Sequence, residues 1–208
     1  MSAGLIAAPS FTFAALILGG LQSSRFLLVL AGYLALTLAY SLYLKRIAFI
    51  DVIALAGLYT LRIFAGGEAT GIEISFYTLA FSMFLFLSLA LIKRFSELQR
   101  LNQESGAIVR GRGYVGVDAL ALQTHGIASG YIAVLVAALY LNSPEMRVLY
   151  TQPQWLWLIC VILLYWMGRA WILAHRGQMN EDPVVFALRD RVSQALGLLT
   201  LMTLYLAS

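Results

Sequence analysis

The apolar run Phe76–Ile92, FYTLAFSMFLFLSLALI, is followed at once by Lys93-Arg94-Phe95-Ser96-Glu97-Leu98-Gln99-Arg100. The run is close to the roughly 20 residues that a helix needs to cross a hydrocarbon core. Three cations and a carboxylate then lie within eight residues, and Lys93 and Glu97, four apart, share a face if the helix continues. Such charges either mark the point where a helix leaves the bilayer or line a polar site at the membrane surface.

The composition of the whole chain indicates a membrane protein. Of its 208 residues, 61% are hydrophobic and only 12% are charged, whereas soluble domains carry about a quarter charged residues. We expect one integral membrane domain over residues 1–208. The single cysteine, Cys160, excludes an intrachain disulfide and a cysteine metal cluster. The net charge of +4 does not by itself indicate nucleic acid, because basic loops of membrane proteins report topology.

Seven apolar segments have lengths near that of a membrane span, and none shows the alternation of a transmembrane strand. The expected fold is therefore all-α, a polytopic transmembrane helical bundle. The segments are Leu5–Leu21, Phe26–Leu44, Ala48–Ala65, Phe76–Ile92, Ile127–Leu141, Trp155–Ala174 and Val192–Ala207.

The distribution of cations between the loops predicts the orientation. Ten of the 14 Lys and Arg residues fall on one side of the predicted membrane, and the opposite loops hold only Arg25 and Arg147. This asymmetry puts that side in the cytoplasm. Residues 98–126 form the longest predicted connection and lie on the same side, so we expect a reactive site to face the cytoplasm. The ten cations are Lys45, Arg46, Lys93, Arg94, Arg100, Arg110, Arg112, Arg176, Arg189 and Arg191.

Ionisable residues also occur within or beside the predicted spans. Asp51 and Arg62 are eleven apart, about three helical turns, so both lie on one face of their segment. An ionisable residue in a span favours a functional hypothesis, although an end anchor and a snorkelling arginine would explain the same pattern. Tyr40, Lys45 and Arg46 form either a phosphate clamp or an aromatic belt with topology-setting charge.

Two further motifs have structural interpretations. Gly111-Arg-Gly113-Tyr-Val-Gly116 matches the letters of the dinucleotide fingerprint, but it lies between membrane helices rather than in a βαβ unit. We interpret it as a flexible basic loop near the lipid headgroups. Asp182-Pro183 is typical of a helix N-cap followed by proline at the first helical position.

Taken together, four motifs in this order resemble the UbiA superfamily of membrane prenyltransferases, and most closely its decaprenyl-phosphate phosphoribosyltransferase-like branch. The resemblance covers nearly the whole chain, and the segment Asp182–Arg191 fits the same branch. The motifs are Tyr40-Ser-Leu-Tyr-Leu-Lys45-Arg46, Asp51, Leu61-Arg62-Ile-Phe-Ala-Gly66-Gly67 and Lys93-Arg94-Phe-Ser-Glu97-Leu98.

The resemblance implies nine transmembrane helices around a cavity that opens to the cytoplasm, in the inner membrane of a bacterium. It implies Mg²⁺ bound to the diphosphate of a donor substrate, with a polyprenyl lipid as the other substrate. The reaction would transfer either a prenyl group to an acceptor, or phosphoribosyl from phosphoribosyl diphosphate to polyprenyl phosphate. A haloacid-dehalogenase-like domain, fused or separate, is a further expected partner.

The sequence departs from the family pattern in two places. The family's first acidic motif, Asn-Asp-x-x-Asp-x-x-x-Asp, has no match here, and the seven segments resemble family helices three to nine. We therefore expect the chain to be the C-terminal portion of a longer protein. Lys93 and Glu97 stand where many relatives have Asp-x-x-x-Asp, which leaves one carboxylate and favours the phosphoribosyl-type branch.

Carried over residue by residue, the resemblance assigns catalytic roles to Lys93, Glu97 and Asp51. It makes Glu97 the metal or ribose contact, and residues 98–126 a cytoplasmic cap that closes the site against water. The expected substrate-binding residues are Tyr40, Lys45, Arg46, Arg62 and Arg94. Two other classes remain open: a non-catalytic binding or assembly subunit that lacks the first acidic motif, and a transporter or receptor. The transporter is disfavoured because no internal repeat is visible.

Overall fold

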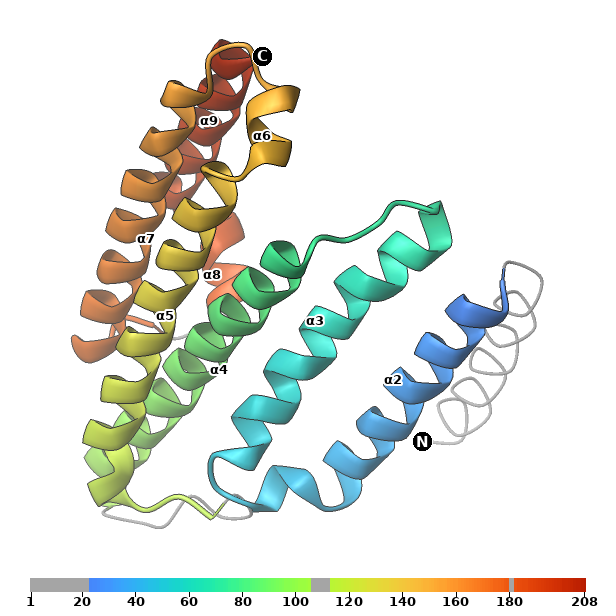
Figure 1. Cartoon of the computed structure of the whole chain (residues 1–208). Coiled ribbons are helices and arrows are strands. Elements are labelled where there is room, and N and C mark those ends of the chain that lie inside the picture. The colour runs from blue at the N-terminus through green and yellow to red at the C-terminus, as the bar shows by residue number, and fades with distance from the viewer. Residues whose placement is uncertain (1–22, 106–112, 180–181) are drawn as a thin grey trace.

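A computed structural model of the chain describes residues 23–105, 113–179 and 182–208. These residues form helices joined by short connections, without a strand among them (Figure 1). The longer helices are α2 (Ser24–Leu42), α3 (Ile50–Thr70), α4 (Phe76–Ser105), α5 (Ala119–Leu141), α7 (Trp157–His175) and α9 (Arg191–Ala207). The shorter elements are α6 (Pro144–Leu149), α8 (Pro183–Arg189), η1 (Leu44–Arg46), η2 (Gly116–Asp118) and η3 (Pro153–Leu156).

Five of these helical segments are long and apolar enough to cross a membrane, namely Ser24–Leu42, Ile50–Thr70, Phe76–Arg100, Gly116–Leu141 and Pro153–His175. A sixth apolar helix, α9, is shorter, with 17 residues. The predicted polytopic membrane bundle is thereby confirmed, and six of the seven predicted segments correspond to helices. The first predicted segment, Leu5–Leu21, lies outside the described residues.

The predicted connection over residues 98–126 is wrong at both ends, because α4 continues to Ser105 and α5 begins at Ala119. Leu91, Phe95 and Leu98 show why α4 continues: they follow one another at helical spacings and are all buried. Their apolar stripe extends beyond the hydrocarbon-length run and keeps the polar residues between them helical. Residues 106–112 of the predicted cap lie outside the described part of the chain.

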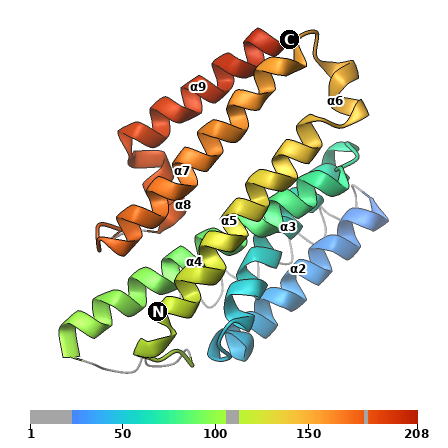
Figure 2. The same cartoon turned by 60° about the vertical axis from the view of Figure 1, so that its left-hand side comes forward.

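The long helices pack in chain order, each against the next, from α2 through α3, α4, α5 and α7 to α9 (Figure 1). Helices α2 and α9 therefore lie at opposite sides of the bundle, as Figure 2 shows from another direction. Helix α4 is central, since it contacts α3, α5, α7 and α8. Side chains of α4 can thus meet partners from several helices.

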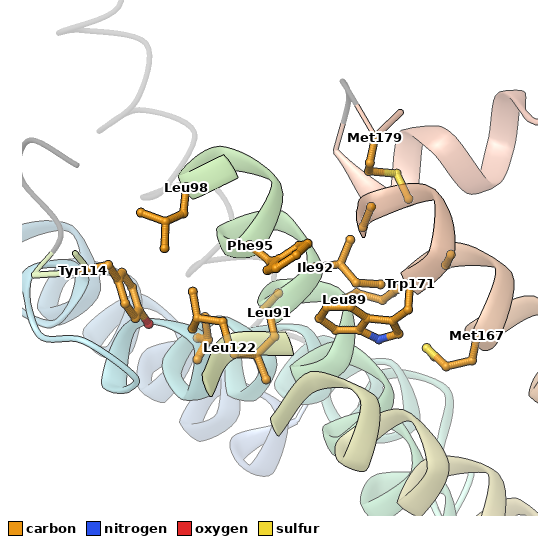
Figure 3. Packing of buried hydrophobic residues seen from close by; sticks show 14 residues of the cluster. Leu89, Leu91, Ile92, Phe95, Leu98, Tyr114, Leu122, Met167, Trp171 and Met179 are labelled. Carbon is orange, nitrogen blue, oxygen red and sulfur yellow. The ribbon is translucent and has the colours of Figure 1, made fainter. Parts of the chain in front are cut away.

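The main apolar core joins residues 89–98 of α4 to α5 and α7 (Figure 3). A polar link runs through it: the Trp171 indole N–H donates to Ser88 Oγ at 3.1 Å, and Ser88 donates to the Gly126 carbonyl at 2.7 Å. A Cβ atom on Gly126 would lie 2.0 Å from the Trp171 ring. Glycine at this position is what lets α5 approach α7 so closely, as small residues do between membrane helices.

The predicted N-cap at Asp182 is confirmed. Its carboxylate accepts the Val184 N–H at 3.0 Å, and Pro183 occupies the first turn of α8. Asp190 caps α9 in the same way, accepting the Ser193 N–H at 2.8 Å. Asp182 also contacts α4, where its carboxylate accepts a hydrogen bond from Lys93.

Candidate functional site

The centre of the candidate site is a buried ion pair between the N-terminal end of α3 and the C-terminal half of α4. The Arg94 Nε donates to Asp51 Oδ2 at 2.6 Å, and the two side chains are 2% and 0% exposed. Asp51 lies in the first turn of α3, where the helix dipole favours a carboxylate. A fully buried pair is a costly feature, so its position at one end of a membrane bundle favours a functional role.

Two further side chains complete the arrangement around Arg94. Its Nη1 donates to Glu97 Oε2 at 2.7 Å, one turn further along α4, and its Nη2 donates to the Tyr40 hydroxyl at 3.3 Å. The planar guanidinium has donors directed to several sides, which suits it to hold partners from different helices. The structure thus brings together four predicted site residues, Tyr40, Asp51, Arg94 and Glu97, from α2, α3 and α4.

Tyr114 belongs to the same cluster, although it is not among the predicted site residues. Its hydroxyl donates to Asp51 Oδ1 and accepts the Phe49 N–H at 2.7 Å. Burial, and then the bond to Asp51, raises the pKa of Tyr114 well above its ordinary value, so the hydroxyl stays protonated. Phe49 has a φ of 67°, a conformation uncommon for a bulky residue, and Tyr114 ties this turn to Asp51.

Gly113 explains how Tyr114 reaches Asp51. It has a φ of 42°, and a Cβ atom there would lie 2.8 Å from the Arg46 carbonyl oxygen. The chain therefore passes directly against the connection between α2 and α3. The interpretation of this segment as a flexible loop is wrong for Tyr114, which is only 4% exposed. The signal that could have identified it is the small Gly113 beside an aromatic residue, between two charged segments.

Lys93 faces another direction from Arg94. Its Nζ donates to Asp182 Oδ2 at 2.6 Å, and the side chains are 39% and 30% exposed. Burial alone would raise the pKa of Asp182, but the hydrogen bond and charge of Lys93 and the Val184 N–H hold it below its ordinary value. This pair forms the polar rim of a narrow cavity of about 40 Å³ between α3, α4 and α8, whose other walls include Tyr59 and Phe86.

The remaining predicted residues lie apart from the buried pair. Arg62 is exposed and donates through Nη2 to the Tyr33 hydroxyl at 2.7 Å, with its guanidinium 4.9 Å from the centre of the Tyr59 ring. Eleven residues of helix place it about 16 Å along α3 from Asp51. Lys45 and Arg46 lie in η1, the connection that leads from α2 to α3.

The residues that the structure describes do not by themselves fit a bound Mg²⁺. They contain no group of three His, Cys, Asp or Glu residues that could hold a metal ion. Both oxygens of Asp51 already have partners, and the Arg94 guanidinium, a cation, bridges Asp51 and Glu97. Since Mg²⁺ requires several oxygen ligands at short range, the site as described has its positive charge supplied by arginine.

Comparisons with known proteins find relatives that are longer than this chain. A scan against models of protein families finds no match. The chain is 39% identical over 180 residues to the uncharacterized protein y4nM of Sinorhizobium fredii, a match that covers 86% of this chain and 35% of that protein. It is 34% identical over 187 residues to the nodulation protein NoeC of Azorhizobium caulinodans, covering 86% of this chain and 60% of NoeC.

A shorter match joins the chain to a named enzyme. Over 83 residues it is 37% identical to the decaprenyl-phosphate phosphoribosyltransferase of Mycobacterium tuberculosis, covering 40% of this chain and 27% of that protein. The chain thus spans about a third of the length of y4nM and three fifths of the length of NoeC. It spans about a quarter of the length of the phosphoribosyltransferase. It is an integral membrane protein with partial similarity to a protein named decaprenyl-phosphate phosphoribosyltransferase.

Proposed function

We propose that this chain forms the membrane domain of a UbiA-type transferase that moves phosphoribosyl from phosphoribosyl diphosphate to a polyprenyl phosphate. The observation that carries the proposal is the buried Asp51–Arg94 pair with Glu97 and Tyr40 at one end of the bundle. The partial similarity to a phosphoribosyltransferase supports this donor over an allylic diphosphate. Prenyl transfer to an aromatic acceptor is the rival assignment within the same class.

In the proposed reaction, the bond between ribose C1 and the diphosphate oxygen breaks, and the diphosphate leaves with the electron pair. An oxygen of the lipid phosphate then forms the new bond to C1. The chain supplies cations that neutralise these phosphates, with Lys93 at the rim of the α3–α4–α8 cavity and Lys45 and Arg46 in η1. Glu97 would accept a hydrogen bond from a ribose hydroxyl. Dependence on Mg²⁺ stays a prediction, and no step here relies on it.

Asp51, Arg94 and Tyr114 act in this proposal as positioning residues. Their mutual hydrogen bonds leave them buried and hold the start of α3 against α4. An internal ion pair in this position keeps α3 and α4 in one relative geometry, and a fixed geometry is the requirement for aligning two charged substrates. Tyr40, bonded to Arg94, connects α2 to the same arrangement.

The orientation proposed from loop charge puts this end of the bundle in the cytoplasm of a bacterium, at the inner membrane. The ten cations of that side include the site's own Lys93 and Arg94. A soluble, highly charged donor such as phosphoribosyl diphosphate is found in the cytoplasm and does not cross a bilayer, so this orientation agrees with the proposed substrate. A haloacid-dehalogenase-like partner domain remains a prediction.

Transfer assays in membranes that contain the chain test the proposal. Labelled phosphoribosyl diphosphate and a labelled allylic diphosphate are compared, each with polyprenyl phosphate or an aromatic acceptor, with and without EDTA. We expect label from phosphoribosyl diphosphate in the lipid fraction. Lys93→Gln should raise KM for the donor at least tenfold, since a phosphate contact is lost, while Arg25→Gln at the other end of α2 should not.

Asp182→Asn distinguishes a phosphate contact from a structural tether. If Lys93 serves only to hold α8, removing either partner of the Lys93–Asp182 bridge should change KM equally. If Lys93 binds the donor, Asp182→Asn leaves the cation in place and KM rises much less than in Lys93→Gln. Equal effects, or wild-type kinetics in Lys93→Gln, would count against the donor-site role.

A second candidate is a non-catalytic membrane subunit that binds a lipid phosphate or assembles with an enzyme. It is favoured by one observation: the cluster's carboxylates are neutralised internally by Arg94, and the described residues hold no metal-binding group. This candidate predicts retention of polyprenyl phosphate without transfer from either donor. Transfer by the wild-type chain would eliminate it.

A further inference from the structure

A second cavity lies between α5 and α7. These two helices lie on the other side of α4 from α2 and α3 (Figure 1). The volume of the cavity is about 470 Å³, within the range of roughly 300–1,000 Å³ of small-molecule sites. Tyr131 and Ile172 on its walls are each about half exposed, on helices that span the membrane. The groove therefore opens toward the acyl chains of the bilayer.

The two ends of this groove differ in chemistry. Its inner end carries Gln123, His175 and Arg176, whereas Ile127, Tyr131 and Ile172 line the part that runs into the membrane. No residue that lines the groove is an Asp or a Glu. A cation and hydrogen-bonding groups at the membrane boundary, followed by an apolar channel, match the two parts of a phospholipid, and basic pockets of this kind between helices bind anionic headgroups.

The local backbone strengthens this polarity. The end of α7 would ordinarily expose carbonyl oxygens, which repel an anion. Here the Arg176 N–H donates to the Ile172 carbonyl and the Gly177 N–H to the Ala174 carbonyl, both at 3.0 Å. The Gln123 Nε2 and His175 Nδ1 form a hydrogen bond with each other at 3.3 Å, and the described residues provide no ion pair for Arg176. The inner end of the groove thus presents the positive charge of Arg176 beside a hydrogen-bonded Gln123–His175 pair.

Gly168 keeps the apolar part of the groove open. A Cβ atom built on Gly168 meets nothing within 4 Å, and Gly168 is one of the lining residues. This contrasts with Gly126 on α5, where the same addition would collide with Trp171. The absence of a side chain at Gly168 leaves room along α7 for a chain of methylene groups.

We propose that this groove is a binding site for an anionic phospholipid of the bilayer. The phosphate contacts Arg176, His175 and Gln123, and an acyl chain lies along Ile127 and Gly168. The polyprenyl phosphate proposed as substrate shares this headgroup chemistry, but the groove does not lead to the Asp51–Arg94 pair. Trp171, a wall residue of the groove that is 3% exposed, packs in the core against Phe95, which is 2% exposed (Figure 3).

Native mass spectrometry of the purified chain, titrated with phosphatidylglycerol or phosphatidylcholine, tests this site. We expect one phosphatidylglycerol to be retained in preference to phosphatidylcholine. Arg176→Gln should weaken that retention about tenfold, while Arg100→Gln, which removes an exposed cation of α4 outside the groove, should not. Equal retention of the two lipids, or wild-type retention by Arg176→Gln, would overturn the proposal.

A groove-filling variant provides an independent arm. Gly168→Phe should abolish retention with Arg176 still present, whereas Gly197→Phe, at an exposed glycine of α9 with nothing within 4 Å, should retain the lipid. A third titration uses polyprenyl phosphate. If polyprenyl phosphate displaces phosphatidylglycerol from the wild-type chain and is itself not retained by Gly168→Phe, the groove belongs to the substrate and the assignment to a bilayer phospholipid is wrong.

Discussion

Replacing Asp51 with alanine leaves the Arg94 guanidinium buried with one of its two carboxylate partners removed. Removing one partner of a buried pair costs about 3–5 kcal/mol because the other charge stays out of water. Because Glu97 still accepts a hydrogen bond from Nη1 of Arg94, we expect Asp51→Ala to lower the free energy of unfolding by about 3 kcal/mol, the lower end of this range. The Tyr114 hydroxyl loses its acceptor in the same variant, so the measured loss includes this second bond.

A double-mutant cycle isolates the pair from these side effects. Asp51→Ala, Arg94→Met and the double variant are unfolded reversibly with SDS in mixed micelles, and helix content is followed by circular dichroism. Because the two side chains are in direct contact at 2.6 Å, their effects should couple by roughly 1–3 kcal/mol, the double variant losing less than the sum.

Arg62→Met supplies the matched control for this cycle. Arg62 is an arginine on the same helix as Asp51, but it is exposed and binds Tyr33 instead. At about 16 Å from Asp51 along the helix, its effect should add to that of Asp51→Ala within about 0.5 kcal/mol. Additive effects for Arg94 as well would refute the inference that Asp51 and Arg94 form the central pair.

Two further outcomes follow from packing and charge. Gly126→Ala should destabilise the bundle by about 1–3 kcal/mol in the same unfolding assay, because a Cβ atom would collide with the Trp171 ring, while Gly168→Ala should be close to neutral. The Lys93–Asp182 bridge should weaken in acid: the pKa of Asp182 lies below its ordinary value of 3.8, so its contribution is complete above that value and is lost as pH falls through the folded-state pKa. Hydrogen exchange of the α8 amides, measured at several pH values in the wild-type chain and in Lys93→Gln, tests this prediction. If the ratio of the two exchange rates does not change with pH, the prediction is wrong.

The membrane fold could be predicted from composition and segment length. Apolar runs such as Phe76–Ile92 bury hydrophobic surface in lipid whatever their neighbours are, so six of them appear as helices near the expected positions. The helix start at Asp182 was predictable for a similar reason, since an N-cap depends on residues adjacent in sequence. The length of α4 was not, because its continuation to Ser105 depends on burial of Leu98 against other helices.

The candidate site, too, was predictable from the sequence only in part. The sequence by itself determined which residues carry charge near the ends of membrane helices, including Asp51, Lys93, Arg94 and Glu97. Only the tertiary structure decided their partners. Neighbours on a helix point about 100° apart, so Arg94 meets α3 while Lys93 meets α8. Tyr114, 63 residues from Asp51, enters the site only because packing brings two distant connections together, which local sequence does not encode.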